Sequence, residues 1–150
     1  MSIKIVSNAF KEGEMIPLKY TCDGENISPQ ISWQVQSDSE KIESFALILN
    51  DPDAPNGDWV HWVVFDIPQG KTQFEENEII KHPLGIGKNS WERNEYGGPC
   101  PPSDTHRYFF RIYALDTLLV SGETTTKDLL MKKMKGHIID SGELMGKYSK

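Results

Sequence analysis

The segment SFALILN, residues 44–50, is the stretch that decides the fold. Its central residues are apolar without interruption, whereas a half-buried strand alternates apolar and polar side chains. A continuous apolar run over 45–49 is typical of a central strand covered on both faces. Further short apolar runs, separated by Gly, Pro, Asn and Asp, predict strands over residues 3–6, 31–35, 62–67 and 108–115.

One segment has the pattern of a helix. Thr125 is placed to cap its N-terminus, with Asp128 three residues later, and an apolar stripe follows over residues 129–134. Gly136 is placed to end it. In the apolar strand at 106–115, His106 and Tyr108 share the more apolar face and should point inward together. The sequence therefore predicts one mostly β domain over residues 1–150.

Composition excludes several classes of function. The chain has 150 residues, 16 Lys and Arg and 22 Asp and Glu, which gives a net charge of −6. A net anion is a poor partner for nucleic acid or for an anionic membrane surface. Without a signal-peptide pattern or a long apolar run, we expect a cytoplasmic protein with no transmembrane segment. Two cysteines, Cys22 and Cys100, are too few for a disulfide framework and predict reduced thiols.

Three segments carry candidate chemistry: NDPDAP at 50–55, WVHWVVFDIP at 59–68 and YGGPCPPSDTHRYFF at 96–110. In the first, Asp51 or Asp53 can be a carboxylate held at a pocket edge or simply the cap of a turn. In the second, a single histidine, His61, opens a strand and can equally be structural. The third combines two glycines and three prolines with an imidazole and a phenol. Such groups can donate hydrogen bonds to a phosphate or a carboxylate. We therefore favour a binding site over the alternative, a rigid surface turn followed by a core strand.

Together these segments resemble the phosphatidylethanolamine-binding protein family, which includes the Raf kinase inhibitor proteins, and in particular its bacterial and archaeal branch. The similarity extends from TCDGENISPQISW near the start to KDLLMKKMKGHIIDSGELMGKY at the end. It implies a sandwich-like fold with a large central antiparallel sheet, a smaller second sheet and one or two short helices. It also implies a small anion pocket at one edge. The helix that covers this pocket in mammalian members has no obvious counterpart, so a more open pocket is expected.

The resemblance also assigns ligand-binding residues. Carried over by position, they are Asp51, Pro55, His61, Gly98, Pro101, Pro102, His106 and Tyr108. Only one of the two prolines is needed, and the loop length leaves open which. Asp51 either accepts a hydrogen bond from a histidine or meets the ammonium of a zwitterionic headgroup such as phosphoethanolamine. The two imidazoles should be partly protonated near neutral pH. The branch often has cysteines at both positions, which implies that Cys22 and Cys100 are neighbours; two buried thiols are favoured over a redox pair.

Several functions follow as alternatives. The first is a protein that binds a small anion or a phospho-headgroup without a cofactor, and that inhibits a protein kinase or a protease. The second is a hydrolase that uses Asp51, His61 and His106 as acid and base groups. Binding is favoured, because no GxSxG motif is present and neither cysteine has a nucleophile signature. A metal site is disfavoured by the ligand spacing, and a homodimer is compatible with the resemblance.

Overall fold

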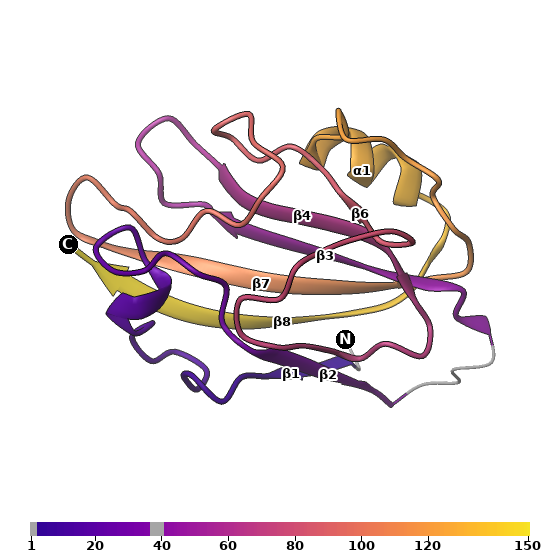
Figure 1. Cartoon of the computed structure of the whole chain (residues 1–150), viewed down its shortest axis with the longest axis horizontal. Helices are drawn as coiled ribbons and strands as arrows, with labels where there is room; N and C mark the ends of the chain where they lie inside the picture. Colours follow the sequence, from indigo (N-terminus) through magenta and orange to yellow (C-terminus); the bar gives the residue numbers. More distant parts are fainter. Residues whose placement is uncertain (1–2, 37–40) are drawn as a thin grey trace.

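The computed structural model describes residues 3–36 and 41–150, which form two antiparallel sheets and one short α-helix (Figure 1). The larger sheet has five strands in the order β6-β4-β3-β7-β8, and the smaller has three in the order β1-β2-β5. The strands are β1 Ile3–Val6, β2 Ile31–Val35, β3 Ser44–Asp51, β4 Trp59–Pro68, β5 Gln73–Phe74, β6 Gly85–Ile86, β7 Thr105–Leu115 and β8 Ile138–Ser149. The helices are α1, Lys127–Met134, and a single 3₁₀ turn, η1, Leu18–Tyr20. The mostly β, sandwich-like prediction is confirmed.

Strand β3 is the centre of the molecule. It pairs with β4 on one side and β7 on the other, and every residue from Ser44 to Asp51 is buried. Phe45, Leu47 and Leu49 point into the main core, which the three-stranded sheet covers, while Ala46 and Ile48 pack on the other face with side chains of α1. Figure 1 shows these layers, with α1 and the pair β1 and β2 on opposite sides of the large sheet. Both faces of β3 are therefore covered, as its continuous apolar run predicts.

The helix and the last strand differ in detail from the sequence prediction. The N-cap of α1 is Thr126, whose Oγ1 accepts a hydrogen bond from the Leu129 amide at 3.3 Å, and not its buried neighbour Thr125. Strand β8 was not predicted. It pairs with β7 over eleven positions from Thr105↔Ser149 to Leu115↔Ile138 and is the longest strand in the described ranges.

Within residues 3–36 and 41–150, no helix is long and apolar enough to cross a membrane. The helical segments there are too short, since α1 has eight residues and η1 three, against the roughly 20 that a spanning helix requires.

Candidate functional site

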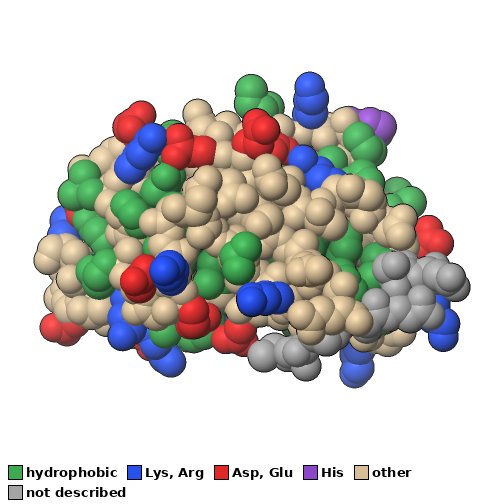
Figure 2. Space-filling model, turned by 90° about the horizontal axis from the view of Figure 1, so that it is seen from below, with side chains coloured by type: hydrophobic (Ala, Val, Ile, Leu, Met, Phe, Trp, Pro, Cys, Tyr) green, Lys and Arg blue, Asp and Glu red, His purple; other side chains and the backbone are tan. Residues whose placement is uncertain are grey.

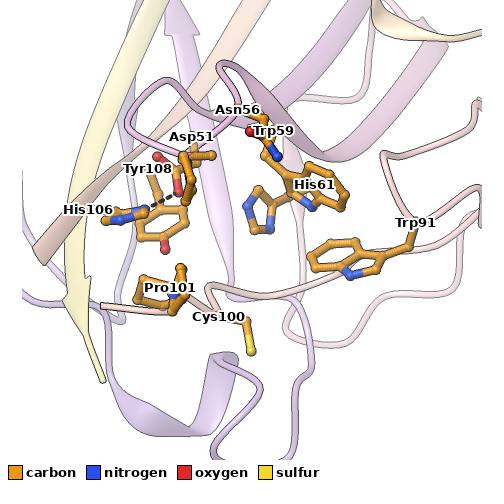
Figure 3. Close-up of a pocket in the computed structure, with 12 residues that line it drawn as sticks. Asp51, Asn56, Trp59, His61, Trp91, Cys100, Pro101, His106 and Tyr108 are labelled. Atoms are coloured by element: carbon orange, nitrogen blue, oxygen red, sulfur yellow. Dashed lines mark hydrogen bonds and ion pairs between the residues drawn. The ribbon is translucent and has the colours of Figure 1, made fainter. Parts of the chain in front are cut away.

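A cavity of about 250 Å³ lies at the edge of the large sheet where β3 ends and β4 and β7 begin (Figure 3). Antiparallel pairing brings these three strand ends together, so that residues far apart in the sequence face one space. The cavity is lined by Asp51, Ala54, Pro55, Asn56, Trp59, His61, Trp91, Cys100, Pro101, Pro102, His106 and Tyr108.

The DPDAP turn is fixed to the start of β7 by two carboxylates. His106 Nδ1 lies 2.7 Å from Oδ2 of buried Asp51, and because a carboxylate oxygen accepts, Nδ1 carries the proton. Asp53 faces the other way and forms a two-pronged ion pair with Arg107, with N···O distances of 2.9 Å. The Arg107 guanidinium lowers the pKa of Asp53 to about 2. Adjacent residues of β7 point to opposite faces, so each carboxylate has its own cationic or imidazole partner.

A β-bulge aims His61 into the cavity. Leu49 pairs with Trp62 and Asn50 with Val60, which leaves His61 as the extra residue of β4. A bulge reverses the alternation of side chains, so His61 and the following Trp62 are both buried toward the main core side, while Val60 packs on the opposite face.

The His61 ring is held in one neutral form. Its Nδ1 donates to the Gly97 carbonyl at 2.7 Å, and burial lowers the pKa of the imidazole below its ordinary 6.5. The expectation that this ring is partly protonated near neutral pH is therefore wrong for the unliganded pocket, because removal from water disfavours the charged form.

The Tyr108 hydroxyl is a fully buried polar group of the site that has no protein hydrogen-bond partner. The side chain is 0% exposed, and its oxygen makes no hydrogen bond with any described residue. Burial, reinforced by the charge of Asp51, raises its pKa, so the phenol keeps its proton and remains a donor. In Figure 3 the hydroxyl points toward the loop that carries Cys100 and Pro101. Leaving such a group unsatisfied costs about 1–3 kcal/mol.

A disulfide joins Cys22 to Cys100 and secures that loop. The Cys22 amide donates to the Pro99 carbonyl at 3.1 Å, so the two segments lie side by side although 78 positions separate the cysteines. The prediction of reduced thiols is wrong, because sequence separation says nothing about this contact. The disulfide also removes the cysteine argument for a reducing compartment.

Seven of the eight predicted binding residues line the cavity, including both prolines whose assignment was open. Gly98 does not line it. Its amide donates to Asn26 Oδ1 at 2.8 Å, and a Cβ there would collide with the Tyr20 carbonyl. This glycine permits close packing of two loops and does not offer its N–H to a ligand. The sequence reasoning missed two aromatic members, Trp59 and Trp91, although Trp59 stands two positions before His61 in the same strand.

The geometry of the site gives little support to the two alternatives, a metal site and a hydrolase site. No group of three or more His, Cys, Asp or Glu side chains within the described ranges could hold a metal ion. Asp51 contacts His106, while His61 turns to a carbonyl, so the three proposed acid and base groups do not form one chain of hydrogen bonds.

Comparison with known proteins agrees with this site and fold. The sequence model of the family described as "Phosphatidylethanolamine-binding protein" matches residues 6–149. This chain belongs to that family. A UPF0098 protein of the archaeon Methanothermobacter thermautotrophicus is 45% identical, with 97% of this chain and 98% of the relative aligned. The bacterial and archaeal character of the resemblance is thereby confirmed.

Two solved structures show the same phosphatidylethanolamine-binding protein fold. A homologue from Chlamydia trachomatis superposes with a TM-score of 0.90 at 39% identity and covers 99% of this chain and 98% of its own. Escherichia coli YbcL, described as a new member of the mammalian family, superposes with a TM-score of 0.91 at 27% identity, over 100% of this chain and 99% of its own. The family supports a ligand-binding protein.

Proposed function

We propose that the cavity between β3, β4 and β7 binds a small anion or the phosphate of a larger ligand. The observation that carries this proposal is the Tyr108 hydroxyl, a fully buried donor without a protein partner. An anionic oxygen is the partner that a buried O–H donor prefers, because charge-assisted hydrogen bonds are about twice as strong as neutral ones.

The neighbouring imidazoles support the same ligand. His106 donates through Nδ1 to Asp51, which fixes the ring and leaves Nε2 for a second partner. Nδ1 of His61 is likewise engaged by Gly97, so its Nε2 is also left for a second partner. A bound phosphate would favour the protonated form of His61, which could then donate to it through Nε2. Binding of the anion should therefore be accompanied by proton uptake.

The hydrogen bonds that Asp51 accepts in the DPDAP turn explain why its carboxylate is tolerated beside an anion. Its Oδ1 accepts the Asp53 amide at 2.8 Å, and its Oδ2 accepts from His106 at 2.7 Å. The carboxylate is thus engaged by donors of the protein and acts as the group that orients His106. Inhibition of a protein kinase or a protease is a further prediction, which rests on the family resemblance alone.

Titration with inorganic phosphate, followed by NMR of the histidine and tyrosine rings, tests the proposal. We expect the ring signals of His61, His106 and Tyr108 to shift along one saturable curve, with His137 as the exposed control. Calorimetry in buffers of different ionisation enthalpy would report the coupled proton uptake. If the three pocket rings do not respond to phosphate, the proposed anion site does not exist.

A further inference from the structure

The turn between β3 and β4 contains a reactive pair of residues, Asn56 and Gly57. Asn56 is the only asparagine of the chain that is followed by a glycine. The backbone nitrogen of the following residue can attack the side-chain amide of an asparagine and close a cyclic succinimide. A side chain on that residue hinders the attack, and glycine has none. Among the asparagines of this chain, Asn56 is therefore the one that its sequence leaves most open to loss of the side-chain amide.

The structure leaves this pair free to react. Both residues are exposed, and the Asn56 side chain makes no hydrogen bond with any described residue. Gly57 has a φ of +102°, and nothing lies within 4 Å of the position that a Cβ would take there. The Gly57 amide donates to the Ala54 carbonyl at 3.0 Å, and this bond has to open before the nitrogen can attack. An exposed hydrogen bond in a turn opens at low free energy, so packing does not oppose ring closure.

The pair Asp23 and Gly24 shows how the same protein protects a similar sequence. An aspartate before a glycine can form the same succinimide with loss of water. Here, however, Asp23 Oδ2 accepts the Tyr148 hydroxyl at 2.6 Å, and a Cβ on Gly24 would collide with the Leu18 carbonyl. Ring closure would have to break these contacts. The β3–β4 turn is thus distinguished by its open structure as well as by its sequence.

Asn56 is also part of the anion cavity. It is one of the lining residues, and Figure 3 shows it beside Trp59, across the cavity from Pro101. Among the lining residues Asp51 is the sole permanently charged group, and neither lysine nor arginine is present. A carboxylate formed at position 56 would therefore add negative charge that no lining residue neutralises.

The cations that contact this turn already have carboxylate partners. Arg107 pairs with Asp53 at 2.9 Å, and Lys127 pairs with Asp58. A new carboxylate at the tip of the turn would have to compete with Asp53 and Asp58 for them. We therefore expect its charge to act on an anion in the cavity.

We propose that Asn56 and Gly57 form a self-modification site, and that its conversion to isoaspartate and aspartate closes the cavity to anions. The Gly57 nitrogen bonds to Cγ of Asn56, the Cγ–Nδ2 bond breaks, and Nδ2 leaves as ammonia with the Gly57 amide proton. Water then opens the succinimide. Opening at the main-chain carbonyl gives isoaspartate, in which the chain runs through Cγ, and opening at Cγ gives aspartate. Both products carry a carboxylate where Asn56 was neutral.

The effect on anions rests on the proposed function, whereas the reaction itself does not. A like charge at the rim of the cavity, partly screened by water, should weaken phosphate binding about three- to tenfold. Isoaspartate also lengthens the main chain of the turn by a methylene. Asp51 and Trp59 pair at the base of this turn, and both line the cavity. The isoaspartate form should therefore disturb the site more than the aspartate form does.

Peptide mapping by mass spectrometry after prolonged incubation of the purified protein tests the modification. We expect the peptide that contains Asn56 to become a mixture of isoaspartate and aspartate forms, with the isoaspartate form accepting a methyl group from isoaspartyl methyltransferase. Asn89 is the internal control, because it is buried and its side chain bonds the Trp91 amide and the Glu95 carbonyl. An unchanged Asn56, or equally fast conversion of Asn89, overturns the site.

Two variants test the effect on the cavity. Asn56→Asp copies one product, while Asn56→Gln keeps an amide whose longer side chain closes its ring far more slowly. In phosphate calorimetry the wild type should lose affinity on incubation, and Asn56→Gln should keep the affinity that it had at the start. Asn56→Asp should bind phosphate about three- to tenfold more weakly than Asn56→Gln from the outset. Equal affinities of the two variants would reject the closing effect.

The outcomes also separate this inference from the proposed function. Phosphate binding by fresh wild type that survives complete conversion of Asn56 leaves the anion site standing and rejects the closing effect alone. Absence of phosphate binding by the fresh wild type rejects the anion site, and with it the closing effect, whatever the peptide map shows. Loss of affinity that follows the conversion of Asn56 and is absent from Asn56→Gln supports both.

Discussion

Tyr108 is the residue at which stability and ligand binding should move in opposite directions. Its hydroxyl is buried and unpartnered, so Tyr108→Phe removes an unsatisfied group and should leave the free energy of unfolding unchanged or raise it by about 1 kcal/mol. Phosphate affinity should fall at least about tenfold, since a hydrogen bond to a charged group is lost. Denaturant unfolding and calorimetry measure the two quantities.

Tyr113 provides the control for this substitution. It lies on the same strand, β7, but it is half-buried against the opposite face of the sheet. Tyr113→Phe should therefore leave phosphate affinity unchanged. Wild-type phosphate affinity in Tyr108→Phe would show that the phenol is not the donor.

His61 should make the protein less stable in mild acid. Burial lowers its pKa below 6.5, so as pH falls below about 6.5 the unfolded chain binds more protons than the folded protein. The stability that neutral His61 contributes is complete above pH 6.5 and is lost as pH falls toward its lower folded pKa. The ring ¹³C signal should titrate with a midpoint below 6.5. In His61→Gln, unfolding curves between about pH 7 and pH 5 should show a shallower loss of stability; an unchanged slope contradicts this account.

The extent to which the sequence predicts structure differs between β3 and β8. β3 was predicted because its apolar side chains fill both faces. In β8 the buried positions are Gly142, Leu144, Gly146 and Tyr148. Two of these four are glycines, which hide the alternation, because a glycine makes close packing possible without adding an apolar side chain. Neither the sequence separation nor the local pattern could reveal that Gly142 approaches the Ile3 carbonyl.

The residues of the site likewise divide into those that the sequence could predict and those that it could not. Asp51, His106 and Tyr108 could be predicted because strand alternation and a family pattern place them together. The inward direction of His61 depends on a bulge that spacing does not show. Trp91 depends on the course of a long loop, and its place at the rim follows from tertiary hydrogen bonds through Asn89.

Gly142 in β8 gives a direct test of this packing. A Cβ there would collide with the backbone carbonyl of Ile3 in β1, which cannot move aside as a flexible side chain can. Gly142→Ala should therefore lower the free energy of unfolding by about 1–3 kcal/mol. Gly122→Ala is the matched control, since nothing lies within 4 Å of its added Cβ. Equal unfolding midpoints for the two variants would contradict this contact between β8 and β1.

The disulfide should contribute both to stability and to the wall of the cavity. Replacing both cysteines, Cys22→Ser with Cys100→Ser, should lower the free energy of unfolding by about 2–4 kcal/mol. Phosphate affinity should also weaken, because Cys100 and Pro101 line the cavity and lose their covalent tie to the η1 segment. Mass spectrometry after alkylation, with and without reductant, counts free thiols. Two alkylated cysteines in the unreduced native protein would refute the disulfide.

At the scale of the whole molecule, the net charge and the cavity affect anion binding in different ways. The chain carries a net charge of −6, and Figure 2 shows acidic and basic side chains interspersed on the face toward β1 and β2. This net negative surface disfavours binding of large polyanions. Binding in the cavity depends instead on donors that act at hydrogen-bond distance and on the aromatic rings among its lining residues. A negatively charged protein can therefore bind a small phosphate ester, although repulsion by its net charge lowers the association rate constant.

The rate constant for phosphate association should rise with ionic strength. Screening weakens the repulsion between the anion and the negatively charged protein, and we expect an increase of about two- to threefold between about 20 and 200 mM salt. The dissociation rate constant should change little, because it depends on contacts inside the cavity. Line-shape analysis of the His106 signals measures both rates, and parallel series in chloride and methanesulfonate separate screening from competition by chloride.

Glu43→Lys is the charge variant that isolates this effect. Glu43 is exposed and directly precedes β3, at the opposite end of that strand from Asp51. The substitution reduces the net negative charge without touching the cavity, so it should speed association at low salt and have no effect at high salt. An association rate that falls as salt is added would mean that the molecule attracts anions from a distance. The cavity would then owe its selectivity to the field of the whole protein and not to Tyr108 and its neighbours.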